Sequence, residues 1–235
     1  MNARTRLLVL LVAAVLATVG VGVVLLGPPS GPVESEYGYS VTLATNATLS
    51  NVTIYLPYPA TADDGDAPFD AAFGGTAGSV SIPDGWGVAP VDTEHGRMLR
   101  VRAAEIPTRN RSDGHSYATH TLEASVPAGH DIDTVDPVGS EPLLRPAEGF
   151  EAVPCPNRGG LPSRSTCRVF GSRLYARYDA PADADVDVFV VFGGYDDGGG
   201  RGSWYSERVI TRLEGPRDGW VEVSGDLQAG AGNAP

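Results

Sequence analysis

The chain contains no lysine and only two cysteines, and these absences restrict its chemistry. Without lysine it has no residue for a Schiff base and none for the phosphate clamp of a nucleotide-binding loop. Its 17 basic residues are all arginines and face 29 acidic residues, which gives a formal net charge of −12. Because nucleic-acid binding needs a basic surface, we expect no nucleic acid partner.

Helical periodicity is also scarce. Outside the apolar N-terminal run, no segment repeats apolar residues at i, i+3 and i+4, and 30 glycines and 19 prolines interrupt the chain. Apolar residues instead alternate with polar ones in short stretches, as is typical of antiparallel strands. The fold class is therefore all-β, an antiparallel β-sandwich with an immunoglobulin-like arrangement as one option. Nine strands are predicted, at residues 37–43, 52–58, 86–91, 98–103, 117–126, 174–178, 186–192, 205–213 and 220–224.

Turn signals predict how some of these strands pair. The first two are expected to form a hairpin across residues 45–48, and the third and fourth to pair across residues 93–96. Residues 188–192 are apolar on both faces, which indicates a central strand. The region 131–168 holds six prolines and few strand signals, so it is either an ordered excursion or a junction between two small β units. We favour one β domain over residues 37–225 and a disordered tail over residues 226–235.

Residues 7–26 form an uncharged run of the length that crosses a bilayer of about 30 Å as one helix. Arg4 and Arg6 precede it, which places a stub of residues 1–6 in the cytoplasm. The predicted protein is a single-pass cell-membrane protein in which a Pro/Gly spacer, residues 27–36, leads to an extracellular β domain. A cleaved signal peptide with its small-residue site at residues 15–17 is the alternative.

Cys155 and Cys167 frame a polar loop that is rich in proline and glycine. On an oxidising cell exterior their expected state is a disulfide, with free thiols as the alternative. A zinc site needs more ligands than two thiols, and no histidine lies within 20 residues of Cys155.

Three asparagines begin acceptor triplets for N-glycosylation: Asn46, Asn51 and Asn110. An extracellular location would make these sites available to the modifying enzymes. The alternative is that Asn and Thr occur together here because they build turns and strands.

The segments 39–43 and 45–59 resemble the opening of haloarchaeal single-span, membrane-anchored surface proteins with a β-rich ectodomain. The resemblance implies a cell-surface β domain and supplies no catalytic residue and no cofactor. Composition agrees with a halophilic source: without Arg4 and Arg6 the exported part has 15 basic and 29 acidic residues, 15 − 29 = −14. Molar salt screens such repulsion to a Debye length of about 3 Å. A GC-rich genome would also remove lysine codons.

Candidate ligand-binding residues fall into two classes. The acidic group Asp131, Asp133 and Asp136 offers oxygens to a hard cation such as Ca²⁺, as do the groups at 63–66 and 196–197. None matches the twelve-residue calcium loop, and solvated acidic turns explain them equally well. Three further candidates, Tyr55, Tyr175 and Tyr205, are aromatic residues beside charged ones and could stack against a sugar, although strand propensity alone accounts for them too.

Enzymatic motifs are missing: there is no Gly-x-Ser-x-Gly elbow and no His-Glu-x-x-His pair. This favours a non-enzymatic surface protein whose β domain contacts an envelope glycan or a partner ectodomain. A binding module for carbohydrate or Ca²⁺ is the alternative, and an extracellular hydrolase is the third option. The hydrolase would require two buried carboxylates, or a histidine such as His115, His120 or His130 and an acid, to converge in a cleft.

Overall fold

A computed structural model describes residues 35–61, 67–108, 117–155, 165–196 and 202–231. These residues form twelve strands and one short helix, α2 (Asp70–Phe73). The strands are β1 (Glu36–Thr45), β2 (Leu49–Ala60), β3 (Ser79–Ser81), β4 (Trp86–Thr93), β5 (Gly96–Ile106), β6 (Ala118–Pro127), β7 (Leu143–Arg145), β8 (Glu148–Val153), β9 (Thr166–Asp179), β10 (Asp185–Asp196), β11 (Ser203–Glu214) and β12 (Arg217–Ala231). The predicted all-β class is confirmed for the described chain.

The N-terminal predictions fall outside this description. Residues 1–6, the proposed transmembrane segment 7–26 and almost all of the spacer 27–36 are not among the described residues. Within the described residues, no helix combines the length and the apolar character needed to cross a bilayer.

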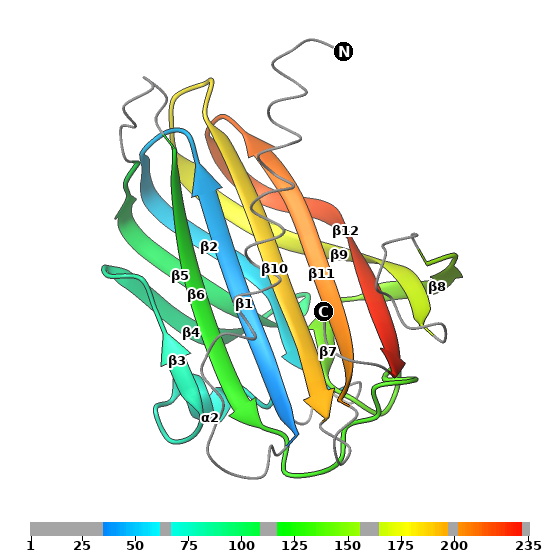
Figure 1. The fold of residues 1–235 in the computed structure, drawn as a ribbon. Helices are drawn as coiled ribbons and strands as arrows, with labels where there is room; N and C mark the ends of the chain where they lie inside the picture. The colour runs from blue at the N-terminus through cyan, green and yellow to red at the C-terminus, as the bar shows by residue number, and fades with distance from the viewer. Residues whose placement is uncertain (1–34, 62–66, 109–116, 156–164, 197–201, 232–235) are drawn as a thin grey trace.

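All strand pairs are antiparallel and belong to one curled sheet in the order β3-β6-β1-β10-β11-β12-β9-β2-β5-β4. The sheet curls so that β6, β1, β10 and β11 form one layer and β9, β2, β5 and β4 form the other (Figure 1). β12 lies at the bend: its residues 217–229 pair with β9, whereas only residues 225–231 pair with β11. The expected two layers are therefore two halves of a single sheet.

The core lies between these layers and is filled by the inward residues of each strand. β10 pairs with β1 and β11 and has buried residues on both faces from Val188 to Val190, which confirms the predicted central strand. Buried tyrosines contribute much of the interior, and most of their hydroxyls have partners: Tyr39 donates to the Pro57 carbonyl oxygen at 2.8 Å across the two layers, whereas the buried Tyr178 hydroxyl has no partner among the described residues. Such partners are needed because an unpaired buried hydroxyl costs about 1–3 kcal/mol.

The predicted hairpin between the first two strands is wrong. β1 pairs with β6 and β10, and β2 pairs with β5, β7 and β9, so the chain crosses from one layer to the other between them. The crossing turn is held by Asn46, whose side-chain oxygen accepts the Asp185 N–H at 2.7 Å. A strand with alternating apolar residues buries the same side chains whether it pairs with the next strand in a hairpin or faces it from the other layer. The alternation therefore could not distinguish the two arrangements. The predicted pairing of β4 with β5 is confirmed.

The proline-rich region 131–168 is an excursion that rejoins the same sheet. Its short strands β7 and β8, which the alternation did not reveal, pair with β2 and β9. The predicted tail is also wrong over residues 226–231, because β12 runs to Ala231 and buries Leu227 and Ala229 against its neighbours. Residues 232–235 lie outside the description.

Candidate functional site

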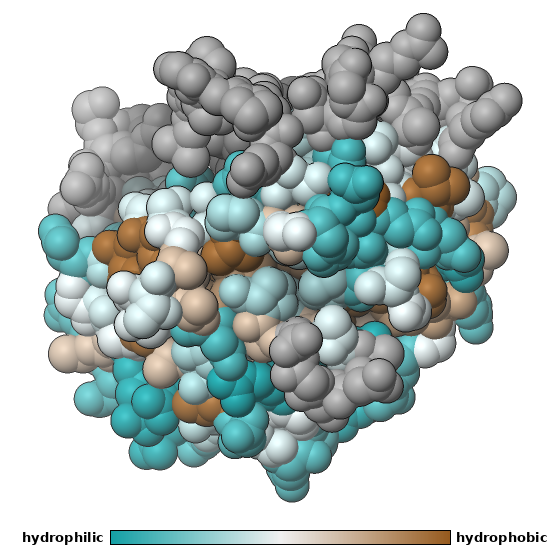
Figure 2. All heavy atoms as spheres, turned by 90° about the horizontal axis from the view of Figure 1, so that it is seen from below, coloured by the Kyte–Doolittle hydropathy of each residue, from teal (hydrophilic) through white to brown (hydrophobic). Residues whose placement is uncertain are grey.

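The surface of the described chain offers few large apolar side chains. Seen from below in Figure 2, hydrophobic residues on the visible surface lie scattered among hydrophilic ones. Five large hydrophobic residues are exposed in the described segments, and Trp220, at 37% exposure, is the only aromatic one among them. An exposed tryptophan on a strand is typical of binding surfaces, where its ring offers a large apolar face.

Trp220 begins a row of aromatic rings across the outer face of the second layer. It lies opposite Tyr175 of β9 in the strand register, and Tyr175 lies opposite Tyr55 of β2. The ring centroids are 5.4 Å apart for Trp220 and Tyr175, 5.3 Å for Tyr175 and Tyr55, and 6.2 Å for Tyr55 and Trp220. Direct cross-strand neighbours touch on one face of a sheet, so three strands bring these rings together.

The turn between β4 and β5 adds His95 to this row. Its ring meets the Trp220 ring edge-on, with centroids 4.3 Å apart and an interplanar angle of 87°. The turn is held by Thr93, whose hydroxyl accepts the His95 backbone N–H at 3.1 Å. We call Tyr55, Tyr175, Trp220 and His95 the aromatic platform.

Hydrogen bonds fix the platform in place. The Tyr175 hydroxyl donates to the Asp218 carboxylate at 2.7 Å, and this bond is the main cause that raises the pKa of Tyr175 above its ordinary value. The Arg173 guanidinium donates to His95 Nδ1 at 3.3 Å. The rings are therefore held at their edges while their outward faces remain half-exposed. Pre-positioned aromatic groups of this kind bind at low entropic cost.

Of the three tyrosines predicted to stack on a ligand, two are in the platform and one is not. The prediction for Tyr205 is wrong: its side chain is 1% exposed and its hydroxyl donates to the Pro142 carbonyl oxygen at 2.8 Å. The alternation of β11 points Tyr205 inward, so its neighbour Trp204 takes the other face. The sequence analysis did not identify Trp220 or His95. Trp220 could have been found from its pattern, because Asp218 and Glu222 lie two residues before and after it and so share its face of a strand.

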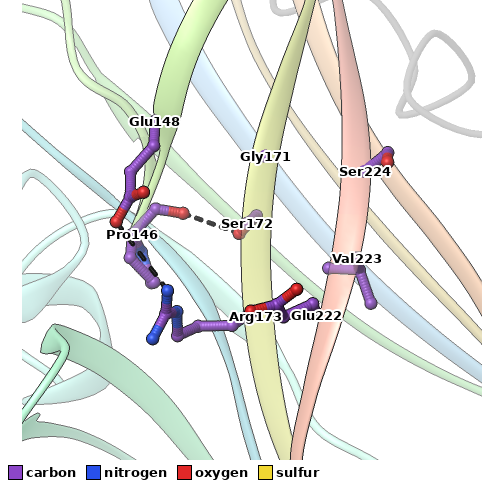
Figure 3. Close-up of a pocket in the computed structure, with 8 residues that line it drawn as sticks. All are labelled: Pro146, Glu148, Gly171, Ser172, Arg173, Glu222, Val223 and Ser224. Atoms are coloured by element: carbon purple, nitrogen blue, oxygen red, sulfur yellow. Dashed lines mark hydrogen bonds and ion pairs between the residues drawn. The ribbon is translucent and has the colours of Figure 1, made fainter.

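A cavity of about 330 Å³ opens beside the platform (Figure 3). The pairing of β2 with β9 ends at Tyr55 and Tyr175, and the pairing of β8 with β9 begins only at Gly171. The cavity forms beside the stretch of β9 between these two pairings. Arg173 and Glu148 reach toward each other across the gap, 3.8 Å apart, and Ser172 donates to the Pro146 carbonyl oxygen at 2.6 Å. From β12, Glu222 and Ser224 complete the polar wall.

A second, shallower depression of about 400 Å³ lies on β2, β4 and β5. Its lining includes Asn51, Thr53 and Arg102, together with Gly85 and Gly87. A side chain at either glycine position would meet little or nothing, so the missing side chains leave the floor open. Because Thr53 is two residues from Tyr55 on β2, this depression is on the platform's face.

Two buried carboxylates lie elsewhere and hold the chain together. Glu141 accepts the Tyr37 hydroxyl and, at 2.8 Å, the Asp133 backbone N–H. Glu207 is fully buried and accepts the Leu144 N–H at 2.6 Å, and burial raises its pKa to about 8. Both acids thus fasten the excursion 131–145 to β1 and β11.

The histidines do not converge on one another in the described part. His130 Nε2 lies 3.5 Å from the Glu141 carboxylate, and its side chain is 57% exposed. His120 Nε2 lies 2.9 Å from the Pro107 carbonyl oxygen instead, and His115 is outside the described residues. The pair of His130 and Glu141 is completed by Tyr37, 3.3 Å from His130 Nε2. Glu141 thus accepts the Tyr37 hydroxyl and a backbone N–H and also faces His130.

Asp131, Asp133 and Asp136, the acidic candidates for Ca²⁺ that the structure describes in full, are not gathered into a ligand set. Among the described residues, no three His, Cys, Asp or Glu side chains are placed to hold a metal ion. Asp133 Oδ1 accepts the N–H groups of Val135 and Asp136, and the Asp136 carboxylate lies 3.5 Å from the Arg168 guanidinium. Asp131 is exposed. Residues 63–66 and 197 lie outside the described residues.

The predicted disulfide is present and links Cys155 to Cys167, with Cα atoms 5.1 Å apart. Of the three glycosylation candidates, Asn51 is exposed at a bulge of β2 and donates to the Asp179 carboxylate at 2.7 Å. Asn46 is half-buried in the crossing turn, and Asn110 lies outside the described residues.

Comparison with protein-family models, with curated proteins and with solved structures finds no match for this chain.

Proposed function

We propose that this chain is a non-enzymatic, membrane-anchored extracellular β domain that binds carbohydrate through the aromatic platform. The observation that carries the proposal is the outward-facing row Trp220, Tyr175 and Tyr55, three rings in contact on neighbouring strands. Aromatic faces bind the apolar C–H faces of sugar rings, and polar groups at the rim accept and donate hydrogen bonds to hydroxyls. Asn51, Thr53 and Ser224 are available at this rim.

The location is part of the same proposal. The uncharged run 7–26 would hold the protein in the membrane with the β domain outside, and a disulfide is typical of oxidising surroundings. In that setting the natural ligand is an envelope glycan, of the same cell or of a partner ectodomain. An immunoglobulin-like relationship of the curled sheet, a haloarchaeal source and glycosylation of the Asn triplets belong to the proposal as well.

The test is retention of the full chain on immobilised polysaccharides in molar salt, with Trp220→Ala and Tyr175→Ala as the informative variants. Truncating a central aromatic contact should lower affinity at least about tenfold. The matched control is Ile210→Ala, which removes a hydrophobic side chain that is 45% exposed on the other layer. Unchanged retention of both aromatic variants would contradict the proposal, as would an equal loss in the control.

A further inference from the structure

Three arginines border the aromatic platform without an acidic partner. Arg100 lies opposite Tyr55 in the register of β5 and β2, and Arg102 and Arg177 lie on either side of Thr53 in the next row. Across the described segments, no carboxylate lies within 4.0 Å of the guanidinium of any of the three. This is unexpected in a chain with 29 acidic and 17 basic residues.

The other described surface arginines in ion pairs behave differently. Arg97, Arg168, Arg173, Arg208 and Arg212 each have a carboxylate partner. Five described arginines have no carboxylate within 4.0 Å of the guanidinium: Arg145, Arg217 and the three on the part of the sheet that carries Tyr55 and the depression beside it. Arg102 lines that depression, and the Nε of Arg100 is buried with no hydrogen-bond partner in the described chain.

Two acids do lie nearby, and each already accepts one hydrogen bond from another side chain. Asp218 is opposite Arg177 in the strand register, but its carboxylate accepts the Tyr175 hydroxyl. Asp179 accepts the side-chain amide of Asn51. Neither forms an ion pair with Arg177 in the described structure.

We infer that the ligand of the platform is an acidic saccharide, whose ring stacks on Tyr55 and Tyr175 and whose carboxylate or sulfate group binds Arg102 and Arg177. The guanidinium group is planar and presents paired donors that match these oxyanions. Thr53 lies between the two arginines and offers a hydroxyl to the same group. This inference rests on the proposed function and specifies its ligand class.

The experiment compares polymers that share a backbone and differ in charge. Polygalacturonate is paired with its methyl ester, and dextran sulfate with dextran, so the two pairs separate carboxylate from sulfate. Binding of the full chain is measured in molar salt, with folding of each variant checked by circular dichroism. We expect the wild-type chain to bind one acidic polymer at least about tenfold more tightly than its neutral counterpart, the gain expected of a charge-assisted hydrogen bond.

The informative variant is the double substitution Arg102→Gln with Arg177→Gln, because both side chains are exposed on strands. It should abolish the preference for the acidic polymer and leave binding of the neutral polymer within about twofold. Arg212→Gln, an exposed arginine of the other layer that pairs with Asp185, is the control and should keep the preference.

The outcomes separate the inference from the proposed function. If the wild-type chain binds neutral and acidic polymers equally and Trp220→Ala loses both, the platform binds sugar and the acidic ligand is refuted. If the double variant retains the preference, the assignment of Arg102 and Arg177 is refuted. Binding that depends on the arginines but not on Trp220 or Tyr175 would indicate simple ion exchange and refute stacking. Failure to bind any of the four polymers would refute the acidic saccharide class.

Discussion

Glu207 should make the stability of this protein fall as the pH rises from about 5 to 8. Its carboxylate is fully buried, one oxygen accepts the Leu144 N–H, and the other has no hydrogen-bond partner among the described residues. Burial raises its pKa from 4.5 to about 8, against smaller lowering effects of the Leu144 hydrogen bond and Arg145. Between these two values the folded chain holds a proton that the unfolded chain has released.

The size of the effect follows from the two pKa values. A shift from 4.5 to about 8, at about 1.36 kcal/mol per pKa unit, corresponds to roughly 3–5 kcal/mol. This stability is fully present below pH 4.5 and is lost as the pH rises through the folded-state pKa. Because the cause is desolvation rather than a long-range charge interaction, molar salt should leave the effect in place.

The perturbation is Glu207→Gln, which keeps the size of the side chain and removes its titration. At pH 5 the variant should be less stable than the wild-type chain by about 1–3 kcal/mol, because its amide N–H groups are buried beside a position with no partner. At pH 9 the order should reverse, since only the wild-type chain then buries a charge. The free energy of unfolding is measured by denaturant titration from pH 5 to 9.

The control is Glu222→Gln, at an exposed position of β12, which should follow the wild-type pH dependence. Other groups that titrate in the wild-type chain, such as the half-buried Asp187 with its raised pKa, remain in the variant and cancel in the difference. Parallel curves for the wild-type chain and Glu207→Gln across this pH range would refute the reasoning.

Three further predictions follow from local geometry. Cys155→Ser should lower the free energy of unfolding by about 3 kcal/mol, the cost of opening a short loop, and a reducing agent should then have no further effect in thermal melts. Gly193→Ala should destabilise strongly, because its Cβ would lie 2.3 Å from a carbonyl oxygen of β11, whereas Gly171→Ala, with its nearest contact at 3.8 Å, should melt close to the wild-type temperature. If the native host glycosylates this chain, peptide mass spectrometry should find Asn51 modified and Asn46 unmodified, because the half-buried Asn46 amide holds the crossing turn. The reverse order would contradict the exposure argument.

The candidate site illustrates how far local patterns reach. Tyr55 and Tyr175 were recognisable as outward residues because each alternates with buried neighbours on its own strand. Tyr205 was assigned to the wrong face because Trp204 and Tyr205 are both aromatic, and a strand that enters beside a glycine-rich loop shows no earlier alternation to set its phase. Only the surrounding core, where the Tyr205 hydroxyl meets the Pro142 carbonyl oxygen, determines which ring is inside.

The sequence by itself determined that the chain is built of antiparallel strands and where the middle of each long strand lies, because alternation of apolar and polar residues is a local property of an extended chain with one buried face. The ends of the strands were not determined: β12 continues to Ala231, past the predicted limit at residue 224. The partners of those strands came only from the tertiary structure, since β1 and β2 present the same alternation whether they form a hairpin or lie in facing layers. The aromatic platform likewise came only from the tertiary structure. Its rings come from β2, β9, β12 and the β4–β5 turn, and contact between segments so far apart in sequence depends on the strand order of the curled sheet.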